Sequence, residues 1–290
     1  MEKISYFDNN QIIALVDQSK FESTKSYILN RYANRVSLKG KKENLIVIDE
    51  LKDKIDLFPH QMNVALKFLN DMGSRVLLAD EVGLGKTIEA CIILKELQAR
   101  YEIKKILILT PASLTTQWQG ELQEKFHEFF EINKSVHNWI REDKIICSID
   151  TAKKEKHMRE IENIKWDCLI IDESHKLKNP KTVAYKAISR IRADYKLFLT
   201  ATPIQNSIMD LFHGVNLLDP GYLGSSYDFK KNYVLDKKGL KTRNEDELKE
   251  RLSHIMVRNT RRSTGLDFTN RNVTTALVEP TKQEKEFEEL

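Results

Sequence analysis

The chain has 290 residues, enough to bury the core of one large domain or of two smaller ones. Charged residues make up 31% of it and aliphatic residues fall in short runs between them, a composition that excludes disordered and fibrous proteins. The formal net charge is only +4, but residues 151–200 hold twelve Lys or Arg against seven Asp or Glu, which suits either a polyanionic partner or a solvated helix face.

Residues 1–53 have no regular pattern and are interpreted as an N-terminal accessory segment with one expected strand at 44–50. From residue 54 onward, short aliphatic runs alternate with polar segments of helix length. This alternation predicts an α/β fold with a central parallel sheet and helices on both faces. Strands are expected at 75–79, 104–110, 144–149, 167–172 and 196–200, and helices at 60–72, 87–100, 114–130, 154–163 and 181–192.

Beyond the last of these strands the pattern turns mostly helical and highly charged. We interpret residues 208–270, approximately, as a helical excursion from the domain at 54–290, returning to the sheet in an expected strand at 272–279. The final TKQEKEFEEL opens a helix and carries no C-cap signal, which predicts that a longer protein continues beyond it.

The segment LLADEVGLGKTIEA has the context of a phosphate loop, because a strand leads into it and a helix pattern follows. Gly83 and Gly85 would let the backbone approach a polyphosphate, and the helix N-terminus would present its N–H groups. Lys86 is expected to reach the β and γ phosphates, and the Thr87 hydroxyl to ligate Mg²⁺. The consensus has glycine where this chain has Asp80, so the motif alone leaves open a helix that happens to begin Gly-Lys-Thr.

Two further expected strands end in side chains that could take part in catalysis. CLIIDESHKLKN ends a strand in two carboxylates, of which Asp172 would hold the metal and Glu173 would polarise the attacking water. Such carboxylates are also common helix caps. LFLTATPIQNS ends another strand, where hydroxyls could sense the metal–phosphate site, or form a plain strand terminus.

The sequence predicts a cytoplasmic protein without a membrane partner. No apolar run approaches the roughly 20 residues that span a bilayer, and MEKISYFDNNQ has neither the basic start nor the apolar stretch of a secretion signal. Cys91, Cys147 and Cys168 lie in apolar runs without CxxC spacing or a nearby pair of histidines, which predicts buried free thiols.

Taken together, the motifs resemble the Swi/Snf-type ATPases of helicase superfamily two, in particular their bacterial RapA-like branch. The resemblance covers roughly residues 56–280, and Asp-Glu ahead of the glycines is typical of this family. In chain order the similar segments are FPHQMNVALKFL ahead of the phosphate loop, DEVGLGKT as motif I, LTPASLTTQWQGEL as motif Ia, ICSIDTAK as motif Ib, IIDESHKL as the DEAH-type motif II, LTATPIQNS as motif III, and GVNLLDPGYLGS and MVRNTRRS at the end of the first lobe.

The resemblance implies the first RecA-like lobe of a DNA-dependent ATPase that uses ATP and Mg²⁺ to move along duplex DNA and remodel protein–DNA complexes. Its implied partners are double-stranded DNA, a nucleic-acid-bound protein complex and a second RecA-like lobe of the same protein, in the nucleoid. No Q-x-x-G-R-x-x-R-like segment follows Pro203, so we expect the second lobe to be absent from this chain and the isolated lobe to hydrolyse ATP slowly or not at all.

The resemblance also assigns residue roles. It makes Gln61 the adenine contact, and His175 a link from motif II to motif III. RNTRRSTG is expected to be solvated or to face DNA rather than to act as an arginine finger. Nucleotide contacts are expected from Gln61, Asp80, Gly83, Leu84, Gly85, Lys86 and Thr87, coupling from His175, Thr200 and Thr202, and nucleic-acid contacts from Thr110, Pro111, Ser113, Ser148 and Asp150.

Several alternatives remain open at this point. Trp118 could stack on a base, although a core position suits its helix better, and Lys176, Lys178 and Lys181 could attract DNA or form a solvated face. The chain could instead be a non-catalytic nucleotide-binding or docking module, or the first lobe of a strand-separating DEAD/DEAH-type helicase. The segments DEVGLGKT, WQGEL and LTATPIQN favour the Swi/Snf type over the latter.

Overall fold

The computed structural model describes residues 42–265, except 206, 237–238 and 240. From Ile46 onward the described residues belong to one compact unit. The proposed accessory segment and its boundary at residue 53 remain a prediction, because most of that segment lies outside the described residues. The strand expected at 272–279 lies outside them too.

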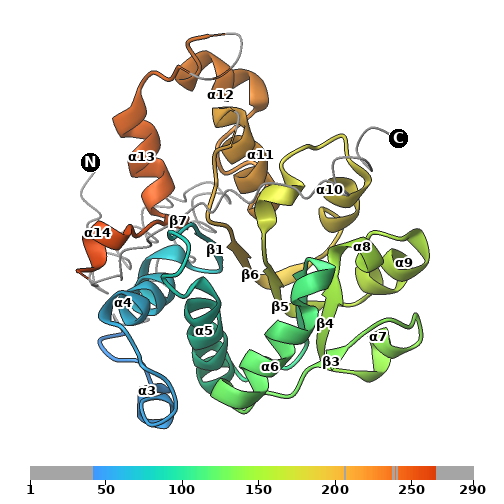
Figure 1. Cartoon of the computed structure of the whole chain (residues 1–290). Coiled ribbons are helices and arrows are strands. Elements are labelled where there is room, and N and C mark those ends of the chain that lie inside the picture. Colours follow the sequence, from blue (N-terminus) through green and yellow to red (C-terminus); the bar gives the residue numbers. More distant parts are fainter. Residues whose placement is uncertain (1–41, 206, 237–238, 240, 266–290) are drawn as a thin grey trace, which may run out of the picture. The chain divides into compact units, whose positions relative to one another are not determined.

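The described residues form a sheet of seven parallel strands in the order β3-β4-β2-β5-β6-β1-β7 (Figure 1). The five strands expected between residues 75 and 200 are confirmed as the five inner ones, and both outermost strands are only two residues long. The bounds are β1 Arg75–Leu78, β2 Ile106–Thr110, β3 Glu131–Ile132, β4 Lys144–Ser148, β5 Trp166–Ile171, β6 Ala193–Leu199 and β7 Met256–Val257.

Helices cover both faces of this sheet, as the alternating pattern predicts. All five residues of β2 are buried, which explains why it reads as a continuous aliphatic run. On one face lie α4 (Pro59–Lys67), which continues as a π-helix at Phe68–Met72, α5 (Lys86–Tyr101) and α6 (Thr115–Phe126). The apolar cluster of the other face includes residues of α7 (Asn138–Arg141), α8 (Ile149–Ala152), α9 (Glu155–Asn163), α10 (Val183–Ile188) and α11 (Ile208–Leu218).

The strand expected at 44–50 is wrong: residues Ile48–Leu51 form a short helix, α3. Val47 and Leu51 are both buried and are spaced four residues apart, which suits a helix face. The backbone N–H of Val47 donates to the buried carboxylate of Glu96 at 2.9 Å, so no neighbouring strand takes this bond.

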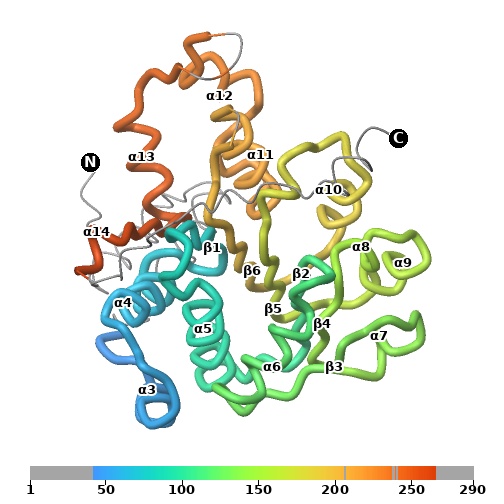
Figure 2. The backbone as a smooth tube through the Cα atoms, viewed as in Figure 1, coloured from blue at the N-terminus to red at the C-terminus, as the bar shows by residue number. Residues whose placement is uncertain are grey.

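After β6 the chain leaves the sheet through α11, α12 (Ser226–Tyr233) and α13 (Glu245–Ser253), and then returns beside β1 as β7, before α14 (Arg261–Thr264) (Figure 2). The helical character expected here is confirmed over its described part. From the sequence, the return to the sheet was expected at 272–279, and none was expected at β7.

The sheet brings the motifs to a single edge. Because every strand is parallel, the segments that follow β1, β2, β4, β5 and β6 all leave from its carboxyl edge, where ligands bind in such folds. The three cysteines are buried and free, as expected, and burial raises the pKa of the Cys147 thiol to about 12. Among the described helices, none is long and apolar enough to cross a membrane.

Candidate nucleotide site

The loop between β1 and α5 has the backbone that a phosphate loop requires. Gly83 and Gly85 take φ values of +90° and +89°, a region that side chains other than glycine rarely adopt. At Gly85 a Cβ would overlap Nε2 of Gln61, so any other residue there would also displace the Gln61 amide. Helix α5 begins directly after it at Lys86 and runs for 16 residues, which places a helix N-terminus at the loop.

The Lys86 ammonium is directed back into this loop. Its Nζ donates to the carbonyl oxygens of Asp80 at 2.8 Å and Glu81 at 3.2 Å. A polyphosphate in the loop would offer the same ammonium stronger, charged acceptors. The cation is therefore positioned for an anionic ligand.

Helix α4 contacts the loop through two side chains. His60 Nε2 donates to the Leu84 carbonyl at 2.9 Å, and Gln61 Nε2 donates to the same oxygen at 3.1 Å. The other end of the Gln61 amide accepts the N–H of Phe58 at 3.1 Å, and the side chain is only 2% exposed. Gln61 thus supports the loop directly, and its expected contact with adenine remains a prediction.

Asp80, which stands where the consensus has glycine, is fully buried. Its carboxylate accepts two hydrogen bonds from Asn259, from the backbone N–H at 2.7 Å and from Nδ2 at 2.9 Å. The departure from the consensus therefore has a structural explanation: the side chain joins the loop to a segment 179 residues later. Asn259 was missed by the sequence analysis, since no local pattern links it to position 80.

Glu89 lies one turn into α5 and is fully buried, and within the described residues neither carboxylate oxygen has a hydrogen-bond donor. Burial, followed by the negative charge of Asp80, raises the pKa of Glu89 to about 10. Glu89 is therefore protonated at neutral pH. In that form it adds no second negative charge beside Asp80, whose carboxylate accepts the two hydrogen bonds from Asn259.

Motif II follows β5, and its two acids are held differently. Asp172 Oδ1 accepts the backbone N–H of Glu173 at 2.8 Å, and Oδ2 accepts the indole N–H of Trp118 at 2.8 Å. Trp118 is 2% exposed, which confirms the core position and adds a polar contact that the sequence did not predict. Glu173 has a φ of +50°, an uncommon backbone conformation that often accompanies functional sites.

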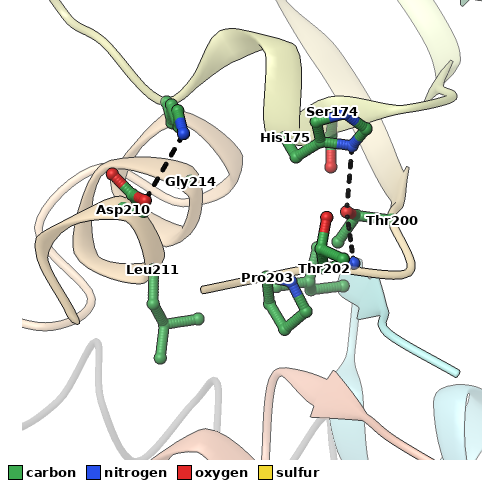
Figure 3. Close-up of a pocket in the computed structure, with 10 residues that line it drawn as sticks. Ser174, His175, Thr200, Thr202, Pro203, Asp210, Leu211 and Gly214 are labelled. Carbon is green, nitrogen blue, oxygen red and sulfur yellow. Dashed lines mark hydrogen bonds and ion pairs between the residues drawn. The ribbon is translucent and has the colours of Figure 1, made fainter. Parts of the chain in front are cut away.

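Motifs II and III meet at His175 (Figure 3). Its ring nitrogen Nδ1 lies 2.9 Å from Oε2 of Glu173 and 3.4 Å from the Thr200 hydroxyl, which in turn accepts the N–H of Thr202 at 3.1 Å. Ser174, His175, Thr200 and Thr202 line a cavity of about 20 Å³, large enough for a water molecule. The structure thus brings the three expected coupling residues together.

The expected nucleic-acid residues lie farther along the same edge, at the ends of β2 and β4. Thr110 and Ser148 are paired neighbours in the sheet. The Thr110 side chain is buried and donates to the Pro111 carbonyl at 2.8 Å, and Ser148 caps α8 by accepting the N–H of Thr151 at 3.1 Å. Ser113 and Asp150 are exposed, and Asp150 pairs with Lys153 at 2.6 Å.

A parallel sheet with a glycine loop and lysine after β1, and with Asp-Glu after β5, defines a P-loop NTPase domain of the RecA-like class. The sequence profile of the SNF2-related domain matches residues 60–288. The chain belongs to the SNF2-related family.

Relatives and solved structures agree with this assignment. The chain is 46% identical over 221 residues to the uncharacterized ATP-dependent helicase YqhH of Bacillus subtilis (strain 168), covering 76% of this chain and 39% of that protein. It is 32% identical over 192 residues to the RNA polymerase-associated protein RapA of Serratia proteamaculans (strain 568), covering 61% of this chain and 20% of that protein. The chain therefore spans well under half of these relatives.

Among solved structures, the fold is similar to the Sulfolobus solfataricus SWI2/SNF2 ATPase core in complex with dsDNA, with a TM-score of 0.63 and 29% identity. That match covers 71% of this chain and 45% of the solved one. The Sulfolobus solfataricus SWI2/SNF2 ATPase core domain matches with a TM-score of 0.61, 29% identity and coverage of 71% and 44%.

Proposed function

We propose that this chain is the N-terminal ATP-binding lobe of a DNA-dependent ATPase that translocates on duplex DNA and remodels protein–DNA complexes. The observation that carries the proposal is the meeting of the phosphate loop and motif II at one edge of the sheet, in a chain of the SNF2-related family. Asp172 and the Thr87 hydroxyl offer oxygen ligands, which Mg²⁺ prefers.

Each residue of the site has a proposed role. Lys86 binds the β and γ phosphates, and the amides of Gly83, Leu84 and Gly85 line the loop around them. Thr87 and Asp172 hold Mg²⁺, whose charge offsets that of the phosphates. Glu173 orients and deprotonates the attacking water, with His175 2.9 Å from its carboxylate. Thr200 and Thr202, which begin the segment after β6, contact the site through His175. A change at the site on ATP hydrolysis would therefore alter the conformation of this segment.

The proposed nucleic acid is double-stranded DNA, bound across the ends of β2 and β4. Support comes from the solved SWI2/SNF2 core in complex with dsDNA and from the exposed segments after these strands. Small hydroxyls at Ser113 and Ser148 suit contacts with phosphates that are independent of sequence, and Pro111, which has no N–H to donate, shapes the turn that leads to Ser113. A nucleic-acid-bound protein complex is the proposed target of remodelling, since one relative is described as associated with RNA polymerase.

The proposed enzyme needs a second RecA-like lobe, which completes the ATP cleft and supplies an arginine to the transferring phosphate. Because the chain spans 39% of its relative YqhH and 20% of its relative RapA, we propose that this second lobe lies in a longer protein. We also propose that this protein works in the cytoplasm at the nucleoid, where its DNA would be. The 290-residue chain alone is then expected to bind nucleotide and to hydrolyse it slowly.

The proposal is tested by measuring ATP hydrolysis and strand displacement by the longer protein with and without duplex DNA. In the wild-type protein, ATP hydrolysis should rise when duplex DNA is added, and no single strands should be released. In Lys86→Ala, ATP hydrolysis should be lost. Hydrolysis that ignores DNA would overturn the translocase proposal. Efficient release of single strands would favour a strand-separating helicase instead.

A further inference from the structure

The segment formed by residues 255–261 runs alongside β1 and the start of the phosphate loop and is hydrogen-bonded to both. Three backbone N–H groups of alternate residues donate to carbonyls of this segment: Leu77 to Ile255 at 2.8 Å, Ala79 to Val257 at 2.8 Å, and Glu81 to Asn259 at 3.1 Å. Strand β1 ends at Leu78, so the pairing continues beyond the strand and into the loop itself. The 255–261 segment therefore acts as a neighbouring strand for the start of the phosphate loop.

Side chains strengthen this pairing at consecutive loop positions. Asn259 donates twice to the buried Asp80 carboxylate, and the backbone N–H of Arg261 donates to Oε2 of Glu81 at 2.8 Å. The Arg261 guanidinium donates to the carbonyl of Val82, from Nη2 at 2.9 Å and from Nε at 3.3 Å. The arginines of this stretch are exposed, as the sequence led us to expect, and Arg261 in addition contacts the loop.

The contact of Arg261 with the Val82 carbonyl fixes the orientation of the peptide bond between Val82 and Gly83. In a trans peptide the carbonyl and the following N–H point in opposite directions, so fixing the Val82 carbonyl fixes the direction of the Gly83 N–H. The carbonyls of Asp80 and Glu81 face Lys86, whereas that of Val82 faces Arg261. A charged donor on a carbonyl also polarises the peptide and makes its N–H a stronger donor to an anion.

Space around Gly83 is consistent with this arrangement. A Cβ added there would lie 3.3 Å from Nη2 of Arg261, so the guanidinium lies directly against the loop at its first glycine. Val82 itself is 68% exposed, which leaves its backbone with little other packing to define its direction.

We infer that Asn259 and Arg261 are positioning residues of the nucleotide site, which set the direction of the loop amides that bind phosphate. This inference rests on the proposed nucleotide-binding function. The helical excursion α11–α13 begins just after motif III and ends just before the 255–261 segment.

The test is a titration of the 290-residue chain with a fluorescent ADP analogue and Mg²⁺. Arg261→Ala should weaken binding by about tenfold, the usual effect of losing a hydrogen bond from a charged donor. Arg261→Lys should restore part of the affinity, because it keeps the charge and one donor. Arg262→Ala is the matched control, since it removes the same charge from α14 and Arg262 makes no hydrogen bond or ion pair within the described part of the chain.

Hydrogen exchange separates positioning from a general loss of stability. In Arg261→Ala the amides of residues 82–85 should exchange faster, while those of β2 and β5 are unchanged. Asn259→Ala should have the same effect, centred on Asp80. Equal nucleotide affinity in wild type, Arg261→Ala and Arg262→Ala would overturn the inference and leave the proposed function standing. A wild-type chain that binds no nucleotide would overturn the proposed function and the inference with it.

Discussion

The carboxyl edge of the sheet has two regions that are held in place differently. At the nucleotide end, residues from distant parts of the chain fix two carboxylates and one loop carbonyl: Asn259 the carboxylate of Asp80, Trp118 that of Asp172, and Gln61 the backbone carbonyl of Leu84. At the proposed nucleic-acid end, contacts are local, as between Ser148 and Thr151 or between Asp150 and Lys153. The difference suggests that chemistry at the first end needs fixed geometry, whereas binding to a uniform phosphate backbone does not.

The largest effect that this comparison predicts is at Glu173. Glu173→Gln in the longer protein should slow ATP hydrolysis by about 10²–10⁴-fold, because the amide cannot accept the proton of the attacking water, and should leave nucleotide binding intact. Glu102→Gln is a suitable control, since Glu102 also has a left-handed backbone, with a φ of +54°, and is exposed at the far end of α5. Hydrolysis that survives in Glu173→Gln would remove this residue from the mechanism.

The next prediction concerns Glu89. Its pKa of about 10 in the fold lies above the value near 4.5 expected when unfolded, so the fold holds a proton that the unfolded chain releases between these pH values. The contribution of Glu89 to stability is thus complete below about pH 4.5 and is lost progressively as the pH rises toward 10.

Glu89→Gln supplies an N–H donor in place of the carboxyl O–H and has no proton to lose as the pH rises. It should therefore raise the free energy of unfolding by about 2 kcal/mol at pH 8 and by little at pH 4.5. Urea denaturation at the two pH values measures this. Glu96→Gln on the same helix should destabilise instead, because the buried Glu96 carboxylate accepts from Val47 and pairs with Arg100 at 2.6 Å. A gain that is equal at both pH values would contradict a protonated Glu89.

Trp118 tests the long-range support of motif II. Trp118→Phe keeps a buried aromatic ring, although a smaller one, and removes the hydrogen bond to Asp172, so it should raise the Mg²⁺ concentration needed for half-maximal nucleotide binding by about tenfold. Trp139→Phe is the matched control: it also removes a buried indole hydrogen bond, at 3.1 Å, but the partner is His157 of α9 and not a residue of motif II. Identical Mg²⁺ dependence in the two variants would show that the Asp172 contact is only structural.

The smallest effect is expected at the nucleic-acid end. The exposed Asp150 carboxylate, whose pKa is lowered by its hydrogen bond to Lys153, repels phosphates, so Asp150→Asn should tighten duplex DNA binding by about twofold at low salt. Asp246→Asn on α13 removes a similar exposed charge and should have no effect. Weaker DNA binding in Asp150→Asn would mean that this side chain supports the interface after all.

The sequence was sufficient for the class of fold and for the five inner strands, because buried parallel strands and phosphate loops have strong local patterns. It failed where the signal was short or remote. Val47 and Ile48 read as part of an aliphatic strand, but Ile48 begins helix α3 and Val47 is its N-cap, and the two residues of β7 are too few to show a period. The pairing of Asp80 with Asn259 joins residues too far apart for any local pattern, and a buried, protonated Glu89 reads like an ordinary helix-surface glutamate.

The central claim, that the edge formed by the phosphate loop and motif II binds a nucleoside triphosphate, is tested most directly by titrating the 290-residue chain with ATP and Mg²⁺. Wild type should bind saturably. Lys86→Ala should weaken binding by about 100-fold through loss of the charged phosphate contact, while Lys125→Ala on α6 should not. Equal affinity in the wild type and Lys86→Ala, or no binding by the wild type, would contradict the claim.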